Sequence, residues 1–324
     1  MKRHLRVSSR QRGVPVFALQ NLASNGTPLY FWHKRRKGGT TLVSAVNQLS
    51  PTIAEQVVER LGFRSFPAPN LSSLRLLYDA WCRRVPFDNI RKLIALRGQH
   101  SGPLPGDDPT DFFSAWLRYG TGGTCWAAHG ALHALLITLG FNSMRGVATM
   151  LVAPNIPPNH GTLTVVLDEE RYLLDASMLH GEPLRLRPTE PAEIGHPAWG
   201  IRSTFEQGQW LLHWRPLHRT EGVDCRIDAL ETDADDFQRR HEDTRVWSPF
   251  NHELVVRLNR GHRVTGIAFG RQVEIDDLGN VVDLPLDSIQ RIKFLIEILG
   301  IDESIVAALP LDEKTPPPPS AAAR

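Results

Sequence analysis

Apolar residues between Ile53 and Leu96 recur with helical spacing. Residues 53–61 carry apolar side chains three to four positions apart, and the pattern stops at Gly62, which is typical of a helix end. Residues 70–84 repeat the pattern after Asn70, a residue type that caps helices. Pro86 ends this helix, because proline restricts the residue before it to extended conformations. A further short helix is predicted over residues 106–120.

The period changes after an amphipathic helix that is predicted to start at Cys125. Residues 143–152 and 160–178 alternate or run β-branched, and the second stretch turns at the acidic residues 168–170. Residues 204–217 are predicted to form a second hairpin. Residues 233–244 then indicate a helix, residues 252–282 strands, and residues 288–300 a last helix. The apolar stripe of this last helix is expected to consist of Ile289, Ile292, Leu295, Ile296 and Leu299.

This order of elements predicts an α+β fold: helices first, then a sheet, then a mixed α/β end. The predicted parts are a disordered N-terminal extension (residues 1–47), a helical bundle (48–123), the Cys125 helix with a β-barrel (124–225), an α/β lid (226–311) and a disordered Pro/Ala tail (312–324). The basic residues 1–47 show no periodicity, and a targeting segment is the alternative interpretation of them.

Composition narrows the class of protein. A net charge of +2, from 37 basic and 35 acidic residues, argues against nucleic acid as the main partner. The chain has no uninterrupted apolar run long enough for a membrane span. Three cysteines are too few for a disulfide framework and fit a reducing cytoplasm. We therefore expect a cytoplasmic protein with neither a nucleic-acid nor a membrane partner.

Cys125 follows Gly-Gly-Thr and stands at the predicted start of a helix, where free N–H groups and the positive end of the helix dipole stabilise a thiolate. A cysteine nucleophile also needs a base and a group that orients the base. His160 lies eight residues before Asp168 in the predicted hairpin, and Asp175 lies six residues after Glu169, so both reach its open end. They would be about two positions out of register, and we therefore expect a bulge or an asymmetric turn.

Two other interpretations of these residues remain open. Cys125 could serve packing alone, with His160 a loop residue and Asp175 a turn acid. Alternatively, Cys125, His129 and His133 recur every four residues on one helix face and suggest a metal site. His133 lies more than two turns from Cys125, so the three cannot share one ion without a fourth ligand and strong bending. We therefore expect no metal.

The chain resembles the arylamine N-acetyltransferases over about residues 50–310. The residues that carry the resemblance are "LSSLRLLYDAWCRRVPFDNI" with its Pro-Phe-acid-Asn signature, "GGTCWAAHGALHALLITLGF" around the cysteine, "HGTLTVVLDEERYLLDASMLHGEPLRL" with fifteen residues from His to Asp, and "DFQRRHEDTRVWSPFNHELVVRLNRGHRVTG" with its Ser-Pro-Phe. The resemblance implies a three-domain fold of helical bundle, β-barrel and α/β lid, with the core of cysteine proteinases and transglutaminases.

The resemblance also implies a function. Cys125 would take the acetyl group of acetyl-CoA in a ping-pong reaction and pass it to an arylamine or hydrazine, as in xenobiotic metabolism. His160 would act as the base and Asp175 would orient it. Acetyl-CoA would be a co-substrate, and no metal would take part. Phe87 and Met178 are the candidate substrate-binding residues.

The chain departs from the family around this triad. Thr121, Thr124, Ala127 and His129 stand where the family usually has Arg, Tyr, an acidic residue and Asn, and Ser177, Met178 and Leu179 replace Gly-Phe-Gly. Two alternatives follow. The chain could be an amide synthase that releases or cyclises an aminoaryl polyketide, or a catalytically silent binding protein.

Overall fold

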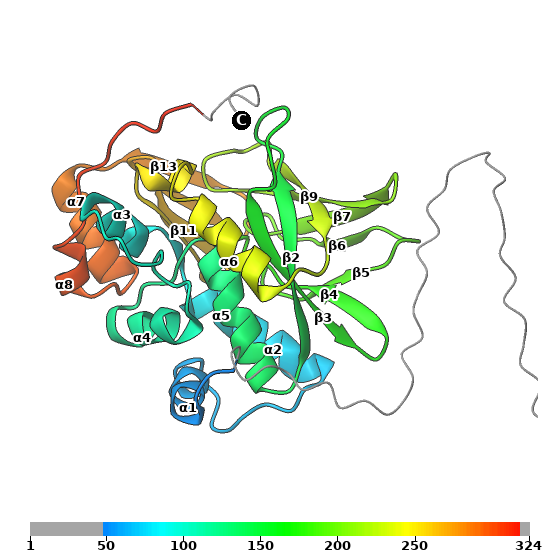
Figure 1. The fold of residues 1–324 in the computed structure, drawn as a ribbon. Helices are drawn as coiled ribbons and strands as arrows, with labels where there is room; N and C mark the ends of the chain where they lie inside the picture. Colours follow the sequence, from blue (N-terminus) through cyan, green and yellow to red (C-terminus); the bar gives the residue numbers. More distant parts are fainter. Residues whose placement is uncertain (1–47, 318–324) are drawn as a thin grey trace, which may run out of the picture. The chain divides into compact units, whose positions relative to one another are not determined.

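The computed structural model describes residues 48–317 (Figure 1). Asn70 caps α2 (Leu71–Arg84) as predicted. Ser50 caps α1 (Pro51–Arg60) and Asp108 caps α4 (Pro109–Tyr119) in the same way. α4 ends at Gly120, whose φ of 76° is the left-handed conformation that glycine tolerates. Strand β1 (Phe87–Asp88) was not predicted, and helix α3 (Ile90–Arg97) lies at the end of the stretch with the helical pattern, although no separate helix was predicted there.

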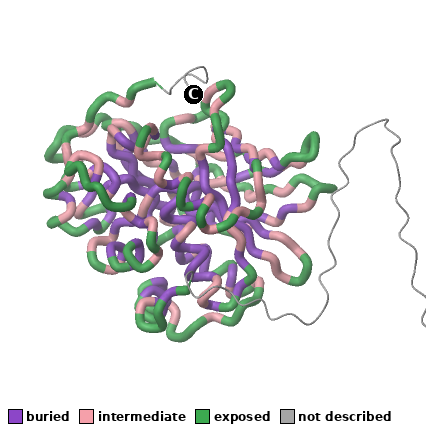
Figure 2. Tube along the Cα trace, in the orientation of Figure 1, coloured by how far each residue is buried: buried purple, intermediate pink, exposed green. Residues whose placement is uncertain are grey.

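Helix α5 (Cys125–Thr138) lies in the middle of the molecule (Figure 1). The prediction that it is amphipathic is wrong, because 11 of its 14 residues are buried. It contacts α4 on one side and β2, β3 and α6 on others, so no face is left for solvent (Figure 2). A helix enclosed in this way holds its first turn, and therefore Cys125, in a fixed position.

The larger sheet has eight antiparallel strands in the order β5-β4-β3-β2-β9-β8-β7-β6. Its strands are β2 (Asn142–Met150), β3 (His160–Leu167), β4 (Glu170–Leu173), β5 (Leu184–Leu186), β6 (Ala192–Ile194), β7 (Ile201–Glu206), β8 (Gln209–Trp214) and β9 (Val223–Ala229). The two end strands, β5 and β6, approach through an isolated bridge between Arg187 and Glu190. The sheet is therefore nearly closed into a barrel, and the two predicted hairpins, β3–β4 and β7–β8, are part of it.

The smaller sheet has the order β1-β10-β11-β12-β13. It consists of β1, β10 (Val255–Asn259), β11 (Arg263–Ala268), β12 (Arg271–Asp276) and β13 (Val281–Pro285), and the helical elements near it in sequence are α6 (Ala234–Asp243), η2 (Pro249–Asn251), α7 (Ser288–Lys293), η3 (Phe294–Ile298) and α8 (Glu303–Val306). β1 pairs with β10, so a segment from the helical part of the sequence joins this sheet.

The predicted apolar stripe of the last helix is only partly buried. Ile289 and Ile292 are exposed, whereas Phe294 and Leu295 lie in the core. The helix changes from α to π winding at Phe294, and this change shifts which side chains face inward. The predicted stripe was based on one regular α-helix, so it did not allow for the change in winding at Phe294.

The predicted N-terminal extension lies outside the described residues, as do positions 318–324 of the predicted tail. The first residues of that tail are attached to the fold: Glu313 N–H donates to the His252 carbonyl, and the Thr315 hydroxyl donates to Glu253. Within residues 48–317, no helix has both the length and the hydropathy needed to span a membrane.

Candidate active site

The Pro-Phe-acid-Asn signature holds the loop before Cys125. Asp88 Oδ2 accepts a hydrogen bond from the Gly122 N–H at 2.5 Å, and Asp88 N–H donates to the Gly123 carbonyl at 3.2 Å. Gly122 packs so closely that a Cβ would lie 1.9 Å from the Pro86 carbonyl oxygen. Two segments that are distant in sequence therefore fix the start of α5, and glycine is required at 122.

Cys125 is the first residue of α5 and is buried. The residue before it, Thr124, makes no capping hydrogen bond through its side chain. The N–H groups of the first turn therefore have no capping bond from Thr124, and the positive end of the helix dipole lies at this end of α5. The predicted helix start at Cys125 is confirmed, and the thiolate stays a prediction.

The structure brings His160 and Asp175 together: His160 Nε2 lies 2.7 Å from Asp175 Oδ2. The predicted bulge between β3 and β4 is absent, because their register is regular from Leu167↔Glu170 to Thr164↔Leu173. Asp175 lies just beyond the end of β4, and its carboxylate reaches diagonally across to His160. The turn itself is formed by Asp168 and Glu169, both with positive φ.

With Nε2 engaged by Asp175, the other ring nitrogen of His160 is the one left for Cys125. Burial opposes a charge on the imidazole, but Asp175 and a hydrogen bond with Cys125 raise the pKa of His160 to about 10. Burial likewise opposes the Asp175 charge, but His160 and His129 hold the pKa of this carboxyl well below its ordinary value. The arrangement therefore favours an imidazolium between a carboxylate and the sulfur.

Two further histidines surround Asp175, and sequence reasoning gave neither a role in the site. His129 Nε2 accepts from the Ala176 N–H at 2.9 Å, so its Nδ1–H donates to the Cys125 carbonyl at 2.7 Å. His180 Nε2 accepts from the Asp175 N–H at 3.2 Å, and burial lowers the pKa of His180 to about 4. One nitrogen of each ring thus accepts a backbone N–H group. The sequence signal that could have placed His129 beside Cys125 was their spacing of four residues on one helix.

The carboxylate of Asp175 is fully hydrogen-bonded. Its Oδ1 accepts from the Ser177 N–H, the Ser177 hydroxyl and the Met178 N–H, all between 2.8 and 3.0 Å. Ser177 and Met178 belong to the segment that departs from the family pattern, and their N–H groups still bind the acid. The orientation of Asp175 is therefore set by the chain that follows it.

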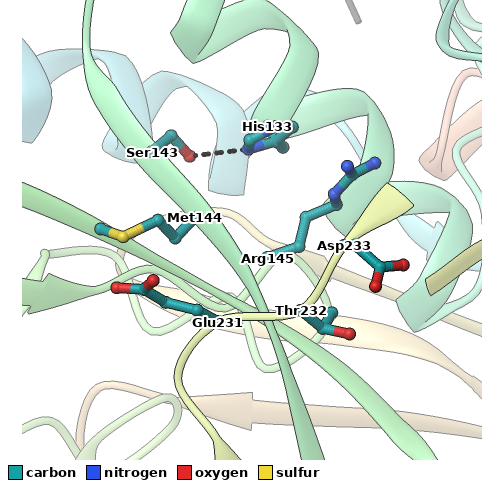
Figure 3. A pocket seen from close by; sticks show the side chains of 7 residues that line it. All are labelled: His133, Ser143, Met144, Arg145, Glu231, Thr232 and Asp233. Atoms are coloured by element: carbon teal, nitrogen blue, oxygen red, sulfur yellow. Dashed lines mark hydrogen bonds between the residues drawn. The ribbon is translucent and has the colours of Figure 1, made fainter. Parts of the chain in front are cut away.

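One group within the described residues has spacing compatible with a metal: His129, His160 and Asp175, whose ligand atoms lie within 4.8 Å of one another. Their facing atoms already bond to each other or to the backbone. The Cys125–His129–His133 alternative fails geometrically, because His133 lies in a different pocket of about 300 Å³. Figure 3 shows His133 bonded to Ser143 there, with Arg145 and Asp233 nearby.

Lys92 is a buried cation near the nucleophile that sequence reasoning did not find. Its Nζ donates to the Thr244 hydroxyl at 2.8 Å, and no carboxylate within residues 48–317 forms an ion pair with it. Burial lowers the pKa of Lys92 to about 7, and the charge of Cys125 is the largest influence that opposes this change. Lys92 is therefore protonated in only part of the molecules at neutral pH, and its charged form interacts favourably with Cys125, whereas Thr121 at the family's usual arginine position is neutral.

The predicted substrate-binding residues are both buried. Phe87 bridges to Gly123 and packs edge-on against Phe250, with ring centroids 5.1 Å apart. Met178 lies in the barrel core with Trp210 and Leu212. Their contact with a substrate stays a prediction. The neighbouring Leu179 is buried with a φ of 54°, which is rare for a residue other than glycine.

A barrel-like sheet, a helical layer and a buried cysteine beside a His–Asp pair define an α+β protein of the acyl-transferring type. A profile of the N-acetyltransferase family matches residues 70–263. The chain therefore belongs to the arylamine N-acetyltransferase family of acyltransferases. An arylamine N-acetyltransferase of Mycolicibacterium smegmatis is 24% identical over 173 residues. That alignment covers 49% of this chain and 61% of the relative, which is less than two thirds of its length.

Solved structures agree with this fold. The Nocardia farcinica arylamine N-acetyltransferase superposes with a TM-score of 0.67 at 22% identity, covering 79% of this chain and 92% of the other. The Salmonella typhimurium enzyme has a TM-score of 0.65 at 20% identity, covering 81% and 98%. The Mycobacterium marinum enzyme in complex with CoA has a TM-score of 0.67 at 16% identity, covering 79% and 97%. The predicted α+β fold of the family is confirmed.

Proposed function

We propose that this protein transfers an acetyl group from acetyl-CoA to an arylamine or hydrazine through an acetyl-Cys125 intermediate. The observation that carries the proposal is the 2.7 Å contact between His160 and Asp175 beside a cysteine at a helix start. Family membership and the CoA complex of a structural neighbour support acetyl-CoA as the donor.

In the first half-reaction, the Cys125 thiolate attacks the thioester carbonyl of acetyl-CoA. The bond between that carbon and the CoA sulfur breaks, and CoA takes the proton from the His160 imidazolium as it leaves. In the second, the amine attacks the acetyl-cysteine, His160 accepts the amine proton, and the Cys125 thiolate leaves. Asp175 keeps the ring oriented and stabilises its charge in both halves.

The compartment and physiological role belong to the same proposal. Cys82, Cys125 and Cys225 are all free and buried, as suits a reducing cytoplasm. Acetylation of foreign aromatic amines is the role that we infer. The preserved His–Asp geometry favours a working enzyme over a silent binding protein.

The test is release of CoA from acetyl-CoA in the presence of an arylamine, compared between wild type and Cys125→Ala. We expect turnover in the wild type and none in the variant, with Cys82→Ala as a matched buried-cysteine control that keeps activity. CoA release that persists in Cys125→Ala would refute the proposal. Rapid turnover with simple arylamines would also count against the amide-synthase alternative. A Cys125 that does not react with iodoacetamide at pH 6 would favour the catalytically silent binding protein.

A further inference from the structure

Arg257 is a buried arginine without an acidic partner. It lies on β10, and its exposed fraction is 3%. Its Nη1 donates to the Arg215 carbonyl at 2.9 Å, but its Nε and Nη2 are buried and have no hydrogen-bond partner among residues 48–317. No carboxylate in the described part of the chain forms an ion pair with it. A guanidinium that loses water without gaining a counter-charge is strongly unfavourable.

The groups around Arg257 add donors rather than acceptors. Its guanidinium lies 5.1 Å from the centre of the Trp214 ring, and the Trp214 indole N–H is itself unpartnered. Arg215 Nε is a further buried donor without a partner. Burial, with the charge of Arg215 adding to it, lowers the pKa of Arg257 to about 10, although Cys82 and Tyr78 act in the opposite direction. Within residues 48–317, neither the Arg257 guanidinium, the Arg215 Nε nor the Trp214 indole N–H has a carboxylate as a hydrogen-bond or ion-pair partner.

The cluster joins the two sheets, because Trp214 and Arg215 belong to the barrel side and Arg257 to the smaller sheet. Trp214 ends β8, and Arg215 follows it in the segment that leads to β9. Both side chains are half-buried, whereas Arg257 is closed off behind them. On its own sheet, Arg257 pairs with Phe87, which bridges to Gly123 in the loop before Cys125. Strand β1 therefore lies between Arg257 and the loop that precedes the proposed nucleophile, Cys125.

We propose that Arg257, Arg215 and the Trp214 indole N–H form a binding site for an oxyanion, the carboxylate or phosphate group of a small molecule. An oxyanion would accept hydrogen bonds from the unpartnered nitrogens and neutralise the two guanidinium groups. The cation–π contact with Trp214 would hold the Arg257 guanidinium in position for the oxyanion. This site does not depend on the proposed acetyl transfer, because binding needs no turnover.

The test is thermal unfolding of the full chain in sodium phosphate against sodium chloride at equal ionic strength and pH. Phosphate at about 50 mM should raise the wild-type Tm by about 3–5 °C, the size expected when a ligand binds only the folded state well above its Kd. Arg257→Met should lose this rise, since methionine keeps the volume and removes the charge. Arg202→Met, at an exposed position on β7, is the matched control and should keep it.

Benzoate and CoA distinguish the two sources of the oxyanion. A Tm rise with CoA that Arg257→Met abolishes supports a phosphate of that molecule, and one with benzoate supports a carboxylate. If Arg257→Met does not fold, the half-buried Arg215→Met replaces it and should lower the affinity for phosphate at least tenfold. The proposal is overturned if the wild type responds to none of the three anions, or if the variants respond as the wild type does.

Discussion

Gly122→Ala tests whether the Pro-Phe-acid-Asn signature positions the nucleophile. The new Cβ would lie 1.9 Å from the Pro86 carbonyl oxygen, whereas ordinary contact begins at 3.4 Å. The two segments would have to separate by about 1.5 Å, which breaks the 2.5 Å hydrogen bond from Gly122 to Asp88. Overpacking costs about 1–3 kcal/mol, and a buried acceptor left without its donor costs about 1–3 kcal/mol. We expect a loss of about 3–5 kcal/mol in the free energy of unfolding.

The same separation displaces Cys125, and a misplacement of about 1 Å lowers a rate by roughly a hundredfold. Urea unfolding and the rate of Cys125 alkylation by iodoacetamide measure the two effects. Gly102→Ala is the matched control, because a Cβ there has no heavy atom within 4 Å. If Gly122→Ala unfolds at the wild-type urea concentration and reacts at the wild-type rate, the signature does not hold the loop as described.

Two other predictions concern buried charges. Lys92→Met should slow the alkylation of Cys125 by iodoacetamide at pH 6 about tenfold, while Lys92→Arg keeps the wild-type rate; an unchanged rate in Lys92→Met would show that Lys92 only caps α6. Asp88→Asn should change the pH dependence of stability, because burial raises the pKa of Asp88 to about 6 from its usual 3.8. The folded protein then binds an extra proton between about pH 4 and 6, so its stability falls as pH rises through this window, by about 3 kcal/mol from this group. Urea unfolding at pH 4, 5 and 6 should show the difference between wild type and Asp88→Asn shifting in favour of the variant, and parallel curves would contradict the assignment.

Local pattern was sufficient for most of the fold. The caps at Asn70 and Asp108, the acidic turn at Asp168–Glu169 and the hairpin turn at residues 207–208 are all written in short stretches of sequence. The prediction that α5 is amphipathic was wrong because α5 is enclosed on all sides and therefore has no solvent-facing side. The π winding after Lys293 also has no sequence period of its own.

The site was predictable where spacing along one hairpin decides proximity, as for His160 and Asp175. Contacts between distant segments were not predictable: His129 meets Ala176 across 47 positions, and Lys92 meets Thr244 across 152. The expected bulge was wrong because pairing was treated as strictly opposite, whereas Asp175 reaches its partner diagonally from beyond the strand. Arg257 gave no signal at all, since an arginine within a strand is ordinarily a surface residue.

Leu179 limits how the segment that follows Asp175 could be redesigned. A buried leucine can usually be exchanged for isoleucine, valine or methionine at modest cost, but the φ of 54° at this position excludes β-branched side chains. Glycine suits the backbone and would leave a void where a fully buried side chain now packs. A mutant library that treats position 179 as an ordinary core position will therefore return mostly destabilised variants.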